Sequence, residues 1–246
     1  MKDGIMPSPE PIPVLLNDMN AGEILWSHAV NSQLKLNTWI KSPIHIIESD
    51  IQRSSEGVIV CAHPPETDSD LTVFELIQKV SETDKGLKLD FKNPDTVEDT
   101  LQYLNYLNLN RPVLLNADIL TGNGAAVSKF EAEEFIMICS QQFPRGILSL
   151  GWTTVPDPNF PYTDKEILSM LELTTGLSGI TFPVRACLLP NSWHVLKTVL
   201  KNPTYTLSIW NNEPVDPELL LWIKANTDPA RTFYDFIDEN NESIRL

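Results

Sequence analysis

The chain has 246 residues, of which 42% are hydrophobic and 21% charged, and it carries a formal net charge of −15 at pH 7. This length suits one large α/β barrel or two small domains. No apolar run approaches the roughly 18 residues of a membrane span, and the chain lacks the clustered Lys and Arg that bind a long nucleic-acid track. The acidity does not exclude a small phosphodiester held by a metal ion.

The opening of the chain does not have the pattern of a folded element. Four prolines occur between Pro7 and Pro13 with little hydrophobic periodicity, so we expect a proline-rich tail over residues 1–20 and one domain over 21–246. The tail lacks the basic start and the continuous apolar core of a secretion signal. The cysteines lack the paired spacing of a disulfide framework or a zinc site, and we expect small buried apolar residues at Cys61, Cys139 and Cys187. These features predict a cytoplasmic protein, with secretion as the alternative if a signal was removed.

From residue 23 onward, short apolar runs alternate with amphipathic segments. The apolar runs predict strands at 24–28, 44–50, 86–92, 112–116, 147–150, 180–184, 205–210 and 232–236. The amphipathic segments predict helices at 32–40, 70–81, 96–107, 127–141, 164–173, 192–200 and 217–225. Eight strands alternating with helices favour a single (β/α)8 barrel of the TIM type. A further extended run at 57–63 lies close enough to the second strand to pair with it as an added strand.

Unusual polar residues occur where the predicted strands end. In barrels of this type the chemistry lies at the rim formed by the carboxyl ends of the strands, so these residues should gather there. From the first strand to the seventh, they are His28, Glu48, Asp50, Asp90, Lys92, Asn116, Asp118, Trp152, Arg185 and Trp210.

Three of these residues are carboxylates from neighbouring strands. Side chains alternate along a strand, so Glu48 and Asp50 share one face. Burying such a pair without a cation costs on the order of several kcal/mol per charge, which calls for a metal, a basic partner or open water. With Asp90 from the next strand, the set suits a hard cation, Mg²⁺ above all, with Ca²⁺ or Mn²⁺ as alternatives.

Two histidines flank the carboxylates. His28 ends the first strand and His63 follows the added strand. An imidazole with a pKa of about 6.5 can act as general base or general acid near neutral pH. Lys92 lies two residues beyond Asp90 on the same face, where its ammonium would meet a phosphate oxygen as a point charge. The sequence therefore predicts acid–base chemistry on a phosphodiester.

Each residue also has a structural explanation. The acids could form an ordinary ion pair with a residue such as Lys88, His63 could cap a turn, and His28 could be a hydrogen-bonded core histidine. The amide and acid at 116 and 118 could satisfy loop backbone, and the tryptophans could be barrel-end packing. Taken singly, each structural explanation is the stronger one. Their joint occurrence at one rim favours a functional site.

Four segments resemble the ordered active-site motifs of glycerophosphodiester phosphodiesterases and, in the H-x-V-N element, of spider-venom phospholipase D barrels: Ser27-His28-Ala29-Val30-Asn31, Ile47-Glu48-Ser49-Asp50, Ala62-His63 and Leu89-Asp90-Phe91-Lys92. Longer blocks resemble the menorin family: 62–70, 85–92, 111–120, 148–154, 181–186, 207–210 and 232–235. The resemblance extends over residues 23–235, nearly the whole predicted barrel.

The resemblance implies a TIM-like phosphodiesterase in which the three acids hold a divalent cation and His28 and His63 do acid–base work. In the related lipases an adjacent substrate hydroxyl attacks the phosphorus and gives a cyclic phosphate. Many glycerophosphodiesterases have a His-Arg pair where this chain has His28-Ala29, so Lys92 or Arg185 would have to supply that phosphate contact. The expected contacts to substrate or phosphate are Lys92, Asn31, Asn116, Asp118, Arg185 and Trp210.

We therefore expect a metal-dependent phosphodiesterase acting on a small phosphodiester of the lipid-headgroup or nucleotide type. The alternative is a non-catalytic binding module that acts through protein partners, because menorin proteins include an extracellular branch that works in neuronal patterning through cell-surface partners. A barrel hydrolase for another kind of bond is a third option, which the pairing of Lys92 with the acids makes less attractive.

Overall fold

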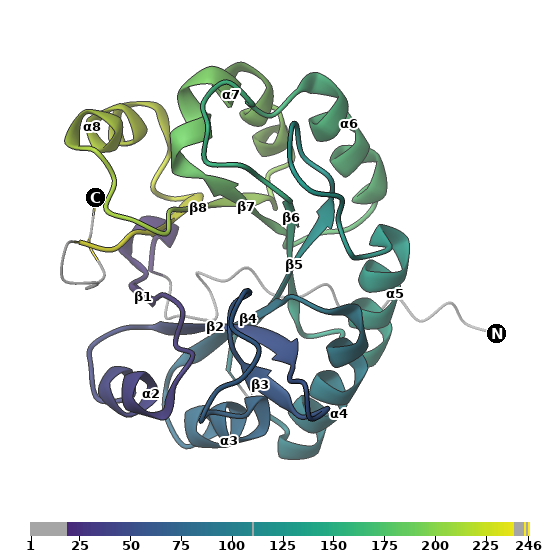
Figure 1. The fold of residues 1–246 in the computed structure, drawn as a ribbon. Coiled ribbons are helices and arrows are strands. Elements are labelled where there is room, and N and C mark those ends of the chain that lie inside the picture. Colours follow the sequence, from purple (N-terminus) through teal and green to yellow (C-terminus); the bar gives the residue numbers. More distant parts are fainter. Residues whose placement is uncertain (1–18, 110, 239–243, 245) are drawn as a thin grey trace.

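The computed structural model describes residues 19–109, 111–238, 244 and 246, and most of the predicted tail, residues 1–18, lies outside them. A nine-stranded sheet curves around the centre of the molecule in the order β1-β2-β4-β5-β6-β7-β8-β9, with β3 attached to β2 (Figure 1). The strands are β1 Trp26–Ser27, β2 Ile46–Arg53, β3 Ile59–Cys61, β4 Gly86–Phe91, β5 Val113–Leu120, β6 Ile147–Trp152, β7 Thr181–Arg185, β8 Thr206–Trp210 and β9 Thr232–Asp235.

Helices form a ring outside the strands (Figure 1). The α-helices are α2 Gln33–Trp39, α3 Val73–Ser81, α4 Val97–Leu107, α5 Ala132–Gln142, α6 Asp164–Leu173, α7 Leu189–Leu196 and α8 Pro217–Asn226. Short 3-10 helices are η1 Ala21–Glu23, η2 Pro94–Thr96, η3 Ala186–Leu188 and η4 Val199–Lys201. Among the described residues, no helix has the length and the apolar character needed to cross a membrane.

Every neighbouring pair along the main strand order is parallel. Strand β3 instead runs antiparallel to the end of β2, with Cys61 opposite Ile51. The predicted TIM-like barrel with an added strand after the second barrel strand is therefore confirmed. Parallel pairing also places the carboxyl ends of all the barrel strands at one rim, which is where the predicted site residues lie.

The barrel closes between β1 and β9 through side chains. Within the described strands these two have no paired residues, so the ring is nearly closed rather than fully hydrogen-bonded. The Trp26 ring packs edge-on against Phe233, with ring centroids 5.6 Å apart. Just before β1, the Gly22 amide donates to the Pro229 carbonyl at 2.7 Å, and a Cβ at this glycine would lie 2.9 Å from the Tyr234 ring. Close packing thus replaces the missing strand pairing.

Local sequence explains where the helices begin. Thr72 and Glu75 form a capping box at the start of α3, and Thr163 and Glu166 do the same for α6, so backbone N–H groups that a helix start leaves free are satisfied. The apolar stripe of α3 is fully buried against the sheet, at Leu76, Ile77 and Val80. The predicted burial of the cysteines is confirmed for Cys61 and Cys139, whereas Cys187 is half-buried.

Two predicted boundaries were wrong in ways that matter for the site. The helix predicted at 127–141 begins only at Ala132, because the Ser128 hydroxyl donates to the Asp118 carbonyl at 2.6 Å and accepts from the Phe130 amide, which holds a non-helical turn. Strand β5 continues past the predicted residue 116 to Leu120. Asp118 is therefore fixed by sheet hydrogen bonds instead of belonging to a loop.

The packing across the β1–β9 seam leads to a prediction about stability. Replacing Phe233 by Ala should lower the free energy of unfolding by about 3–5 kcal/mol, because a fully buried ring is replaced by a cavity where no strand pairing holds the seam. Urea denaturation would measure the change. The matched control is Tyr106→Ala on the outer face of α4, where the side chain is 81% exposed and its loss should cost under about 1 kcal/mol. Equal effects of the two substitutions would contradict this account of closure.

Candidate active site

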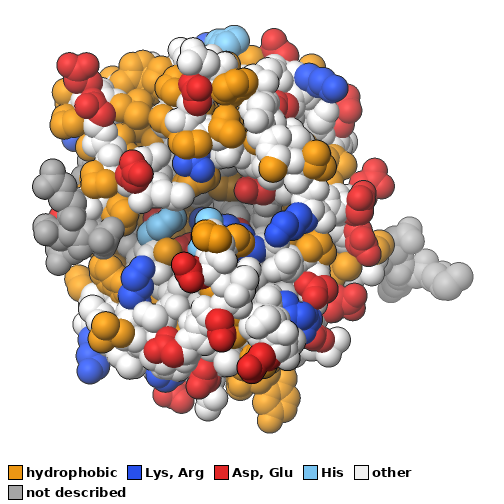
Figure 2. All heavy atoms as spheres, in the orientation of Figure 1, with side chains coloured by type: hydrophobic (Ala, Val, Ile, Leu, Met, Phe, Trp, Pro, Cys, Tyr) orange, Lys and Arg blue, Asp and Glu red, His pale blue; other side chains and the backbone are white. Residues whose placement is uncertain are grey.

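A cavity of about 260 Å³ opens at the rim where the barrel strands end. Figure 2 shows it as a hollow in the middle of this face, with histidine and basic side chains around it. Most of the predicted site residues line it: His28, Glu48, Asp50, His63, Asp90, Lys92, Asn116, Asp118, Arg185 and Trp210. The remaining lining residues were not predicted as site residues: Lys88, Thr153, Thr154, Pro183 and Asn212. The predicted candidate Trp152 is buried in the core against Tyr162 and Phe182.

The three predicted metal ligands meet in this cavity. Asp50 on β2 pairs in register with Asp90 on β4, and Glu48 lies two residues earlier on the same face of β2. Their carboxylate oxygens lie within 4.8 Å of one another. Glu48 and Asp50 are buried and Asp90 is half-buried. Sheet register therefore brings together three acids that are up to 42 positions apart in the sequence.

Within the described part of the chain, each of the three carboxylates accepts a hydrogen bond from one backbone or side-chain amide. The Ala29 amide donates to Glu48 Oε2 at 2.6 Å, Asn31 Nδ2 to Asp50 Oδ2 at 2.7 Å, and Asn116 Nδ2 to Asp90 Oδ1 at 2.8 Å. The predicted substrate contacts at 31 and 116 thus hold the acids, and Asn31 does not line the cavity. The Ala29 amide reaches its acceptor with φ of +51°, a left-handed backbone that costs a residue with a Cβ on the order of 1 kcal/mol.

One lysine faces the second oxygen of two of these acids. Lys92 Nζ lies 2.7 Å from Asp90 Oδ2 and 3.0 Å from Asp50 Oδ1. Lys88, which the sequence offered as an ordinary ion-pair partner for the acids at 48 and 50, lies instead 3.8 Å from Asp235 Oδ2 and over the Trp26 ring. An ion pair with lysine therefore exists at two of the three acids, but a different lysine makes it. The predicted contact of Lys92 with a phosphate oxygen stays a prediction.

The protonation of the cluster reflects burial and crowding. Burial, together with the neighbouring Asp50 carboxylate, raises the pKa of Glu48 to about 7. Burial would also raise the pKa of Asp50, but the Lys92 ammonium and the Asn31 amide outweigh it and hold that pKa below its ordinary value. Burial and the Asp90 carboxylate raise the pKa of Asp118 to about 7. Near neutral pH the cluster therefore has an incompletely compensated negative charge.

These residues fit a hard divalent cation. Each acid keeps one oxygen that no backbone or side-chain amide of the described residues engages. Two of these three oxygens face the positive charge of Lys92. An all-oxygen carboxylate set is the kind that Mg²⁺, Ca²⁺ and Mn²⁺ prefer. Glu48, Asp50 and Asp90 are therefore the residues that would hold the ion.

His28 is paired with an acid that the sequence analysis missed. Its Nδ1 lies 3.2 Å from Asp235 Oδ2 and 3.9 Å from Glu48 Oε2. Burial alone would lower the pKa of His28, but the Asp235 carboxylate and then Glu48 outweigh it and raise that pKa to about 9. Asp235 is the last residue of β9, so the strand-end rule that found the other candidates would have found this one too.

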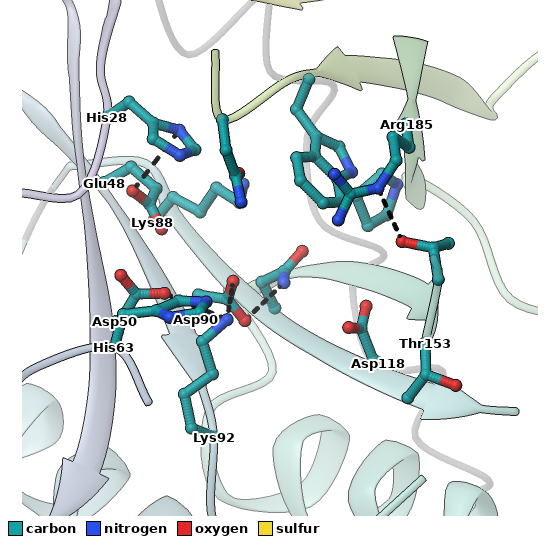
Figure 3. Close-up of a pocket in the computed structure, with 15 residues that line it drawn as sticks. His28, Glu48, Asp50, His63, Lys88, Asp90, Lys92, Asp118, Thr153 and Arg185 are labelled. Carbon is teal, nitrogen blue, oxygen red and sulfur yellow. Dashed lines mark hydrogen bonds and ion pairs between the residues drawn. The ribbon is translucent and has the colours of Figure 1, made fainter. Parts of the chain in front are cut away.

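His63 is exposed and has a different partner. Its Nδ1 lies 2.6 Å from the Pro64 carbonyl oxygen. A carbonyl oxygen can only accept, so Nδ1 carries a hydrogen, and Nε2 is the ring nitrogen left to exchange a proton. Both imidazoles line the cavity (Figure 3), with His28 protonated beside its acid and His63 engaged through Nδ1.

The family model for the menorin N-terminal domain matches residues 20–241 of this chain. The chain belongs to the menorin family. A relative among curated proteins is the human Protein FAM151B, which is 36% identical over 239 residues that cover 92% of this chain and 87% of the relative. The expected family resemblance is confirmed.

Solved structures share the fold of this menorin-family chain. A glycerophosphoryl diester phosphodiesterase from Parabacteroides distasonis superposes with a TM-score of 0.55 at 13% identity, over 93% of this chain and 90% of that one. A glycerophosphodiester phosphodiesterase from Agrobacterium tumefaciens gives a TM-score of 0.51 at 10% identity, over 86% and 91%. At these identities the likeness shows the barrel fold alone.

The contact between His28 and Asp235 leads to a testable pKa. Replacing Asp235 by Asn removes the main charge that keeps the imidazole protonated, so the pKa of His28 should fall from about 9 by more than about one unit. An NMR titration of the histidine ring would measure it, with Asp118→Asn as the control that leaves the His28–Asp235 contact in place. An unchanged His28 pKa in Asp235→Asn would show that this pair does not set its protonation.

The raised pKa of Glu48 predicts how metal affinity depends on pH. Below about pH 7 this carboxyl holds a proton that a cation must displace, so the Kd for Mg²⁺ should fall about tenfold per pH unit up to about 7 and then level off. Calorimetry in buffers of different ionisation enthalpy would count the proton released. In Glu48→Gln this proton release should disappear and binding should weaken, whereas Glu131→Gln on the outer surface should behave as wild type.

Proposed function

We propose that this protein is a divalent-metal-dependent phosphodiesterase that acts on a small phosphodiester. The observation that carries the proposal is the meeting of Glu48, Asp50 and Asp90 between two histidines in one cavity. Three oxygen-donor acids supply a site for a hard cation, and two imidazoles supply proton transfer on either side of it. The glycerophosphodiester phosphodiesterases that share the fold support the same class of substrate.

Each protein group has a defined task in this proposal. The bound cation would neutralise charge on a phosphate oxygen. His63, in its neutral form with the hydrogen on Nδ1, accepts at Nε2 the proton of the attacking hydroxyl, either a water or an adjacent hydroxyl of the substrate that gives a cyclic phosphate. His28, kept protonated by Asp235, donates a proton to the leaving oxygen. Asp235 is thus a positioning residue for the acid.

Positive charge for the phosphate comes from the barrel wall. Where many glycerophosphodiesterases have an Arg after the first histidine, this chain has Ala29, whose amide is already used by Glu48. Lys88 and Lys92 both line the cavity, and Lys92 is the one within ion-pair distance of two of the acids. We assign the phosphate contact to Lys92, because its ammonium lies at the carboxylates that would hold the metal.

The proposal predicts that chemistry and metal binding can be separated. His28→Ala and His63→Ala should each reduce kcat by about 10²- to 10⁴-fold on a phosphodiester panel while still binding Mg²⁺. Asp50→Asn should lose both, because it removes a ligand charge, and EDTA should abolish wild-type turnover until Mg²⁺ is restored. The measurements are initial rates and calorimetric titration with Mg²⁺.

The control is His194→Ala, an exposed histidine on α7 far from the cavity lining, which should keep wild-type rates. Turnover that survives both His28→Ala and Asp50→Asn would overturn the proposal, since neither the proton transfer nor the metal would then be required.

A specific observation favours a second candidate, a non-catalytic binding module that acts through protein partners. Lys92 already supplies a positive charge to two of the three acids, so the cluster has an internal cation. In a module of this kind, Mg²⁺ would not bind at millimolar concentration and no diester would be turned over. Replacing Lys92 by Met would then destabilise the fold, since it would leave two buried or half-buried acids without their partner.

A further inference from the structure

The cavity has two ends that differ in chemistry. One end holds the three acids on β2 and β4. The other is the wall made by Thr154, Arg185 on β7 and Trp210 on β8, which we call the Arg185 wall. In the strand order, β2 is the second strand of the ring and β7 the sixth, so the two groups stand on opposite sides of an eight-strand barrel. Figure 3 shows Arg185 across the cavity from His28 and Glu48.

The Arg185 guanidinium is fixed at its own wall. Its Nε donates to Thr154 Oγ1 at 2.9 Å, and its plane lies over the Trp210 ring with the central carbon 4.2 Å from the ring centroid. The backbone amide of the same residue donates to the Tyr162 hydroxyl at 3.1 Å. A guanidinium anchored by a stacked ring and a hydrogen bond loses little entropy when it binds a ligand, so this side chain is preorganised.

The part of Arg185 that faces the cavity has no partner in the described part of the chain. Its two terminal nitrogens make no hydrogen bond there, and its guanidinium forms no ion pair within 4.0 Å. Two other arginines have their terminal nitrogens occupied: Arg53 pairs with Asp95 and Asp99, and Arg231 donates to three backbone carbonyls. The two terminal nitrogens of Arg185 form the guanidinium fork. In a chain with a net charge of −15, a half-buried guanidinium with this fork unoccupied is suited to bind an anionic group.

Asp118 lines the same cavity as this wall. Its carboxylate interacts with Arg185 electrostatically but does not come within ion-pair distance. It is held back on β5 against Gly151, where an added Cβ would lie 2.5 Å from Asp118 Oδ1. The fork therefore stays open toward the cavity, and the Thr154 hydroxyl, which accepts from Nε, keeps its own hydrogen for another acceptor.

Room also exists for a substrate with two arms. A second cavity of about 220 Å³ adjoins the first and shares with it His28, Asp50, His63 and Asn212. The shared residues include both imidazoles and one of the acids. A phosphodiester at this junction would therefore direct one arm toward Arg185 and the other into the second cavity, beside Lys35 and Ile237.

We propose that Arg185, with Thr154, binds a second anionic group of the substrate, a carboxylate or a phosphate on the arm that points away from the metal-binding acids. The proposal rests on the proposed function for the position of the reacting phosphate. The two terminal NH2 groups, with four N–H bonds in one plane, and the hydroxyl of Thr154 match the oxygens of such a group. Arg185 then determines which diesters are preferred, while the acids and histidines carry out the reaction.

The test compares matched diesters. Glycerol phosphodiesters are made with propanol, 3-hydroxypropanoate or 3-hydroxypropyl phosphate as the second alcohol. A second set has five-carbon arms, so that two distances between the reacting phosphate and the second anionic group are tested. Wild type should show kcat/KM at least about tenfold higher for an anionic arm than for the neutral arm of equal length. In Arg185→Gln this ratio should fall to about one, and in Arg185→Lys it should be intermediate because the charge remains but the fork is lost.

The control is Arg145→Gln, an arginine that stacks on Phe143 away from the cavity and should keep the wild-type ratio. A wild-type ratio of one or below, or a ratio that persists in Arg185→Gln, overturns the inference. Comparing kcat/KM for the carboxylate and the phosphate diesters identifies which anionic group Arg185 prefers.

A binding measurement separates this inference from the proposed function. Propane-1,3-diyl and pentane-1,5-diyl bisphosphate are titrated by calorimetry against the matching monophosphates, with and without Mg²⁺. If no diester is turned over, the proposed function fails. The inference about Arg185 is still supported if wild type binds the bisphosphate at least about tenfold more tightly than the monophosphate and Arg185→Gln does not. Equal affinity for mono- and bisphosphate in wild type overturns it.

Discussion

Buried carboxylates at the rim of the barrel are the constraint on which the rest of the site depends. An ionised acid taken out of water needs a donor or a cation beside it, and the structure supplies each one separately. A backbone amide holds Glu48, side-chain amides hold Asp50 and Asp90, and Lys92 faces the last two. Burial and the Asp50 carboxylate still raise the pKa of Glu48 to about 7, so this compensation is incomplete at one of the three acids, and a cation there would supply positive charge.

Residues of the candidate site also make contacts across the seam between β1 and β9. His28 follows β1 and Asp235 ends β9, the two strands that close the ring without pairing in the described structure. Their imidazole–carboxylate contact and the ion pair between Lys88 and Asp235 both span this seam. Below them, the Trp26 ring packs on Phe233. A polar contact that sets the protonation of His28 therefore also helps to hold the barrel closed.

Charge is distributed unevenly between the surface and the cavity. The chain has 33 acidic and 18 basic residues, yet Lys88, Lys92 and Arg185 all line the cavity, and Figure 2 shows basic side chains around the hollow. The same cavity is lined by four carboxylates, so these cations give it local anchor points for a small anion and not an overall positive charge, while the acidic surface repels extended polyanions. This distribution agrees with a compact anionic substrate and not with a long nucleic-acid track.

The sequence by itself determined the architecture and most of the site. Alternating apolar runs and amphipathic segments predicted the barrel, and strand ends predicted the acids and histidines, because both patterns are local and periodic. Only the tertiary structure decided the partners: Asn31 holds Asp50, Lys92 instead of Lys88 faces the acids, and Asp235 holds His28 from 207 positions away. Such pairings depend on sheet register and barrel closure, which bring together residues that no local pattern connects. Helix α5 begins late for a similar reason, since the Ser128 hydroxyl bonds to the backbone of Asp118 on β5.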